Sequence, residues 1–221
     1  MARTIRRRPG PPTTIALPPL TAFGDASLQP HGDYEAADFV DCDFADQRAG
    51  GASFLGCRFR ECGLDGVEMP RSHVSECVLE DCHALSVDVN ESTWRESLVS
   101  GGRYGALRAA ASSWMDVRLR GCKFDFADLS GARLTNVVFE DCVFGGLDLG
   151  DAQLTDVRLY GCSVAELTVE GAKLAKVDLS RSVLGVVIGV GGLRGAIIGR
   201  DQLLDLAPLL AVHVGLEVRT D

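Results

Sequence analysis

A period of five residues runs through most of this chain and limits what it can fold into. Every position whose number ends in 4 or 9, from Phe39 to Leu184, is apolar, which makes thirty such positions in a row. Neither an α-helix nor a β-strand repeats its side-chain directions every five residues, so the period counts a larger structural unit. Two residues before these positions, twenty-six of the thirty residues are Ala, Cys, Ser, Val or Gly, and the exceptions are Gln47, Leu107, Leu147 and Leu167.

A second period, of twenty residues, gives the number of sides in that unit. Four sides of five residues make one coil, and like residues then stack above one another in successive coils. We predict a square parallel β-helix, with the small and large residues of each side inward, the other three outward, and coils about 4.8 Å apart. Six of the eight cysteines share one place in this period: Cys42, Cys62, Cys82, Cys122, Cys142 and Cys162.

The chain resembles the pentapeptide-repeat family, whose motif A(D/N)LXX is met literally by Ala127-Asp128-Leu129 and loosely from residue 37 to about 200. The resemblance implies an all-β fold, a right-handed quadrilateral parallel β-helix, over residues 33–200. Residues 1–32 hold most of the prolines and predict a mobile tail and an irregular lead-in. Residues 201–221 predict a short C-terminal helical cap with Asp201 as its N-cap, because an open β-helix end would expose unpaired strands.

Two irregularities are expected within the coils. Tyr104 faces Trp114 across the interior, which predicts an overpacked and distorted coil over residues 101–113. After Leu184 the apolar positions come one residue earlier than the five-residue period requires, which predicts that one residue has been lost near Gly185. The shifted apolar positions are Ile188, Leu193 and Ile198.

The eight cysteines are explained by the repeat rather than by metal or redox chemistry. None is spaced as CxxC, and all eight fall at the inward small position, where a free thiol packs as a small hydrophobic group. We therefore expect no metal and no cofactor. A ladder of reduced thiols favours a reducing compartment, so we expect a cytoplasmic protein.

The sequence lacks the signals of an enzyme or of a membrane protein. It contains no GxSxG, P-loop or HExxH motif, and a regular rod offers no obvious concave pocket, so we expect no catalytic activity. The most apolar stretch, residues 183–198, carries Arg194 and is too short to span a membrane. Prolines interrupt the first twenty residues, so we expect no export signal.

Function is expected on the outer surface, which is acidic but unevenly so. The formal net charge is −9, with −8 in residues 37–100, +3 in residues 101–136 and −4 in residues 137–186. Such a surface disfavours direct nucleic-acid binding through phosphates. The best-known pentapeptide-repeat proteins are dimeric rods that imitate duplex DNA, occupy the DNA-binding saddle of DNA gyrase and protect it from quinolones or topoisomerase poisons. The resemblance implies the same topoisomerase-inhibiting, antibiotic-resistance role here.

The number of charges on the rod leaves a second function open. Duplex DNA carries one charge per ~1.7 Å, so ~36 Å of rod replaces roughly 21 charges, over twice those of this chain. The alternative is therefore a structural protein–protein interaction scaffold with an unrelated partner. The candidate partner-binding carboxylates are Asp65, Glu68, Asp88 and Glu91, and the candidate homodimer contacts are Leu203, Leu206, Leu209 and Leu210.

Overall fold

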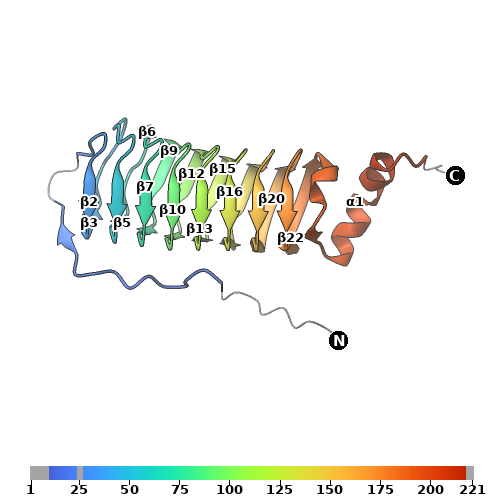
Figure 1. The fold of residues 1–221 in the computed structure, drawn as a ribbon, viewed down its shortest axis with the longest axis horizontal. Helices are drawn as coiled ribbons and strands as arrows, with labels where there is room; N and C mark the ends of the chain where they lie inside the picture. The colour runs from blue at the N-terminus through green and yellow to red at the C-terminus, as the bar shows by residue number, and fades with distance from the viewer. Residues whose placement is uncertain (1–9, 24–26, 218–221) are drawn as a thin grey trace.

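In the computed structural model, which describes residues 10–23 and 27–217, the chain winds into a right-handed four-sided solenoid followed by one helix (Figure 1). We name the four sides by their first complete coil: face A holds residues 37–40, face B 42–45, face C 47–50 and face D 52–55. Each later coil adds twenty residues. Face D alone stacks eight strands, so about 4.8 Å per strand gives a rod roughly 34 Å long.

Short strands make up faces A and D. Face A contains β3 (Ala37–Val40), β5 (Arg58–Arg60), β8 (Val78–Glu80), β11 (Leu98–Ser100), β14 (Arg118–Arg120) and β17 (Val138–Glu140). Face D contains β2 (Asp33–Glu35), β4 (Ser53–Leu55), β7 (His73–Ser75), β10 (Thr93–Arg95), β13 (Ser113–Met115), β16 (Arg133–Thr135), β19 (Gln153–Thr155) and β21 (Lys173–Ala175).

Longer strands turn the corner between faces B and C. They are β9 (His83–Asp88), β12 (Arg103–Arg108), β15 (Lys123–Asp128) and β18 (Val143–Asp148), preceded by the short β6 (Val67–Glu68). The last coils contain β20 (Arg158–Thr168), β22 (Val177–Ile188), the 3-10 helix η1 (Val190–Leu193) and β23 (Ala196–Ile197). The chain enters through β1 (Thr21–Ala22) and leaves through α1 (Arg200–His213).

The strand register confirms the predicted twenty-residue stacking. Every strand pair is parallel, and residues twenty apart lie side by side, as Phe39 does with Phe59. The two phenyl rings stack with centroids 4.5 Å apart. All thirty repeat centres face inward, and only Leu174 and Leu184 are not fully buried.

The coil over residues 101–113 is regular, so the predicted distortion is wrong. β12 pairs in register with β9 and with β15. The interior is also not overpacked, since an apolar void of about 50 Å³ lies among Trp94, Tyr104, Trp114 and their neighbours. Gly102 is needed at the corner before Tyr104, because its φ is +90° and a Cβ there would clash with the Cys82 carbonyl oxygen and lie 3.2 Å from the tyrosine hydroxyl.

The twenty-residue offset between paired strands changes later in the chain than the sequence suggested. The offset is still twenty where Leu167 pairs with Val187, which is buried. It becomes nineteen where Val177 pairs with Ala196. The residue is therefore lost in the segment 189–195 and not near Gly185. Ile188 points outward instead of inward and is 40% exposed.

Both ends of the solenoid are covered. At the N-terminal end β1 pairs with β3, so part of the expected irregular lead-in is a strand, and Phe23 packs against Phe39. Gln47, which replaces the usual small residue at its inward position, helps to cover this end. Its side-chain oxygen accepts a hydrogen bond from the Leu28 amide at 2.7 Å.

The C-terminal end is covered by α1, a single helix that continues through Pro208. Its N-cap is Gly199 rather than Asp201, which lies in the first turn. The Gln202 side chain closes this helix end by accepting a hydrogen bond from the Gly199 amide at 2.7 Å. Leu206 is the one fully buried residue of the helix.

Candidate protein-binding surface

Most corners of the coil are left-handed, and this geometry explains much of the acidity. The residue two after an inward large residue has positive φ, as Asp41 does after Phe39. Left-handed backbone is most accessible to Gly, Asn and Asp. Of the seventeen non-glycine residues described with positive φ, eleven are Asp or Glu.

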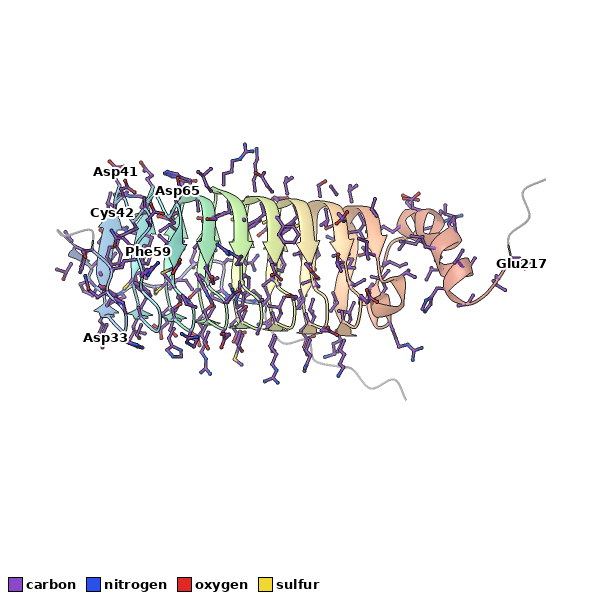
Figure 2. All side chains as sticks on the ribbon, turned by 90° about the horizontal axis from the view of Figure 1, so that it is seen from above. Asp33, Asp41, Cys42, Phe59, Asp65 and Glu217 are labelled. Atoms are coloured by element: carbon purple, nitrogen blue, oxygen red, sulfur yellow. The ribbon has the colours of Figure 1, made fainter. Side chains whose placement is uncertain are left out.

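These corner carboxylates form columns along the rod, because residues twenty apart lie in adjacent coils. One column lies between faces A and B, and a second lies between faces D and A. Asp41 and Asp65 project outward near the N-terminal end (Figure 2). The first column contains Asp41, Glu61, Asp81 and Asp141, and the second contains Glu76, Glu96, Asp116 and Asp156. The sequence reasoning missed these columns, although the twenty-residue spacing was readable.

The four candidate carboxylates lie close together but are not equivalent. Glu68 and Asp88 are register partners on face C, and Glu91 lies at the next corner. Asp65 lies on face B, where it accepts a hydrogen bond from the Leu85 amide at 2.6 Å.

Asp65 and Asp88 stabilise the backbone through hydrogen bonds. Asp88 accepts a hydrogen bond from the Asn90 amide at 2.9 Å, as Asp65 does from Leu85. Glu68 and Glu91 are exposed, and within the described part of the chain their side chains make polar contacts only with arginines, Arg48 at 3.4 Å and Arg71 at 3.9 Å. Glu68 and Glu91 are thus the cleaner probes of partner binding.

The cysteines are reduced thiols packed in the interior of the coils. All eight are free, and seven are buried while Cys42 is half-buried. The Cys142 thiol donates to the Glu140 and Leu119 carbonyls at 3.4 and 3.6 Å, and the Ser182 hydroxyl uses the equivalent Leu159 carbonyl at 3.0 Å. A hydrogen bond with the Cys122 thiol, together with burial, raises the pKa of Cys142 to about 12.

The described residues contain no group of three or more His, Cys, Asp or Glu side chains arranged to hold a metal ion. In the same part of the chain, no helix has the length and apolar character needed to cross a membrane.

The C-terminal end carries the largest group of exposed apolar side chains. Among the four candidate leucines, Leu206 is 4% exposed and Leu210 packs against the core, so both belong to the cap. Leu203 and Leu209 are 49% and 45% exposed. Monomeric proteins seldom expose large apolar patches, so these side chains are candidates for an interface. The other exposed members of this group are Val183, Val186, Ile188, Ile197, Leu204, Val212, Val214 and Leu216.

The structure is a four-sided β-solenoid of pentapeptide repeats. Each side has five residues, and each corner is either a residue with left-handed backbone or a strand that continues around the corner. The sequence profile for the pentapeptide repeat region matches residues 112–187, and that for eight copies of pentapeptide repeats matches residues 37–75. The chain belongs to the pentapeptide-repeat family. No curated relative matches the sequence significantly.

Solved structures to which this chain is similar include full-length QnrB1, a plasmid-mediated fluoroquinolone resistance protein. It is 16% identical over 84% of this chain and 100% of that chain, with a TM-score of 0.31. A trypsin-treated variant of QnrB1 is 19% identical over 92% and 98%, with a TM-score of 0.29. HetL, a pentapeptide repeat protein involved in heterocyst differentiation regulation in the cyanobacterium Nostoc, is 17% identical over 74% and 90%, with a TM-score of 0.27.

Proposed function

We propose that this chain is a non-enzymatic acidic rod that binds DNA gyrase, or a related topoisomerase, in place of DNA and protects it from quinolones or topoisomerase poisons. The observation that carries the proposal is the stacking of exposed carboxylates on a rod without projecting loops, in the two corner columns and around Glu68 and Glu91 on face C and its next corner. Within each column three successive coils carry carboxylates about 4.8 Å apart, and these form two short lines of negative charge: Asp41, Glu61 and Asp81 in one, and Glu76, Glu96 and Asp116 in the other. The buried reduced thiols suit the cytoplasm, where gyrase acts.

A dimer gives the rod a length closer to that of a bound duplex. We infer that two chains join end to end around a twofold axis, which buries the same patch of both chains. Leu203 and Leu209 lie in that patch, whereas Leu206 and Leu210 hold the cap on the rod.

Competition with DNA tests the proposal directly. Purified gyrase is bound to a fluorescent duplex, and the protein is added while fluorescence anisotropy is followed. We expect displacement of the duplex at low micromolar dimer. Glu68→Lys combined with Glu91→Lys should weaken displacement at least tenfold, since both carboxylates are exposed. Glu166→Lys with Glu170→Lys is the matched control, because it makes the same charge change at exposed positions near the other end. Failure of the unaltered protein to displace DNA rejects the proposal.

The alternative, an interaction scaffold with an unrelated protein partner, has one observation in its favour. Neighbouring coils pair many charges of opposite sign, as Lys176 does with Asp156 at 3.4 Å and Arg103 with Asp125 at 3.5 Å. Such pairing lowers the charge that a DNA-binding saddle would meet. If the unaltered protein does not displace the duplex from gyrase, the scaffold is favoured.

A further inference from the structure

The N-terminal segment 10–20, which we call the strap, lies along face A. Figure 1 shows it running from β1 back beneath the strands toward the C-terminal half of the rod. It is anchored by Arg118 of β14. The guanidinium of this arginine donates from Nη2 to the Pro11 carbonyl at 3.1 Å and from Nε to the Pro12 carbonyl at 3.2 Å. At the other end Pro18 lies against Gly56, where a Cβ would approach the proline ring to 3.1 Å.

Outward side chains are more buried on face A, where the strap lies, than on face B, and we call the surface of face A beside the strap the groove. Val138 on face A and Val143 on face B both hold the outward position just before an inward large residue. Val138 is 1% exposed, whereas Val143 is 45% exposed. The same contrast holds for arginine side chains, with Arg118 13% exposed on face A and Arg103 72% exposed on face B. Face A therefore has a covered apolar floor, to which Val78 at 6% exposure also belongs.

The chemistry of this groove suits an extended, proline-containing peptide. Four of the eleven strap residues are proline, and the strap is uncharged. Proline lacks an N–H and favours extended backbone whose carbonyls remain free to accept hydrogen bonds. Arg118 supplies two donors to such carbonyls and is held in place by Glu140 at 2.9 Å. Pro11 is buried, and the half-buried strap residues are Pro12, Ile15, Leu17 and Leu20.

The strap is held in a way that permits exchange. β1 and Phe23 bond to the backbone of the first coil, with Thr21 and Phe23 amides donating to Ala36 and Asp38 carbonyls at 2.8 and 3.0 Å. Among the described backbone hydrogen bonds, none joins residues 10–20 to the rod. Residues 21–23 thus form a fixed point, and the strap before it depends on Arg118 and apolar contact.

We propose that face A is a recognition groove for an extended, uncharged, proline-containing segment of a partner protein, and that the strap occupies this groove in cis until such a segment displaces it. The proposal is independent of gyrase binding, because it concerns the covered floor of face A and not the carboxylates.

The test uses the full chain with Thr13→Cys, an exposed strap position, labelled with a fluorophore. The chain without this substitution, labelled in parallel, measures any reaction at Cys42. An excess of unlabelled peptide of residues 10–20 should lower the anisotropy of the label, because the strap is released. Arg118→Ala should lower it without peptide, whereas Arg120→Ala, which removes an exposed arginine from the same strand, should not. Unchanged anisotropy with millimolar peptide, or with Arg118→Ala, overturns the proposal.

A second measurement uses the chain shortened to begin at Thr21. It should bind the labelled peptide of residues 10–20 at least tenfold more tightly than the full chain does. A peptide in which the four prolines are replaced by alanine should bind less well. A shortened chain that unfolds like the full chain in a thermal melt but does not bind the peptide overturns the proposal. If the shortened chain does not fold, displacement in the full chain decides the question.

Discussion

Trp94 and Trp114 occupy the same position in adjacent coils, with ring centroids 6.0 Å apart and ring planes tilted by 47°. Both indoles line the apolar void of about 50 Å³. Their N–H groups also differ. Trp94 donates to the Ser92 hydroxyl at 3.0 Å, whereas the buried Trp114 N–H has no partner in the described structure. Substitutions in this coil are therefore the ones expected to increase the stability of the core.

Filling the void should stabilise the protein. Val117 lines the void, and Val137 holds the same position one coil later but does not line it. A void of this size costs about 1 kcal/mol at ~24 cal/mol per Å³. We expect Val117→Ile to be neutral or to stabilise by up to ~1 kcal/mol, and Val137→Ile to destabilise by ~1–3 kcal/mol through overpacking. Urea unfolding measures both, and equal effects of the two changes would contradict this account of the core.

The thiols should be protected by the fold. A bulky thiol reagent should modify at most Cys42 in the native protein and all eight cysteines in denaturant, because seven are buried. Cys142→Ala should cost about 1 kcal/mol, and Cys142→Leu about 1–3 kcal/mol. Mass spectrometry of the labelled protein counts the modified residues. Rapid native labelling at several inward positions would show that the register is wrong.

Acid should remove one stabilising contact in the first two coils. The Arg58 guanidinium holds the pKa of Asp38 below its ordinary value through bonds of 2.8 and 2.6 Å. Since the folded pKa is the lower one, this contribution is complete above the unfolded value of about 3.9 and is lost as the pH falls through the folded value. Asp38→Asn should therefore be less stable than the unaltered protein at pH 7, with the difference shrinking by pH 2. Urea midpoints at the two pH values measure this, and a constant difference would be inconsistent with the pair.

Substitutions of exposed and of buried leucines in α1 should have different effects if the dimer forms as proposed. Leu203→Asp with Leu209→Asp should give folded monomers, because both side chains are about half exposed. Leu206→Asp should instead loosen the cap, because it places a carboxylate where the side chain is 4% exposed. Sedimentation and thermal melts distinguish the two results. An unaltered protein that sediments as a monomer at micromolar concentration would remove the dimer from the proposed function.

The sequence predicted the solenoid because its period records which side chains face inward. It could not place the lost residue, because Val187 and Ile188 are both apolar and either could face the core. It predicted crowding at Trp114 because side-chain volumes are readable but the tilt between rings in adjacent coils is not. It could not predict the strap either, since Pro12 is held by Arg118, 106 residues further along the chain. For the candidate surface, spacing indicates which carboxylates stack but not that Asp65 and Asp88 also bind backbone amides.

The central claim, that an acidic rod takes the place of DNA on a topoisomerase, is tested most directly by DNA supercoiling with purified gyrase. We predict inhibition at low micromolar dimer that weakens steeply with added salt, because the association is electrostatic. Glu68→Lys with Glu91→Lys should inhibit at least tenfold less well while melting at a similar temperature. No inhibition by the unaltered protein, or equal inhibition by the charge-reversed variant, would contradict the claim.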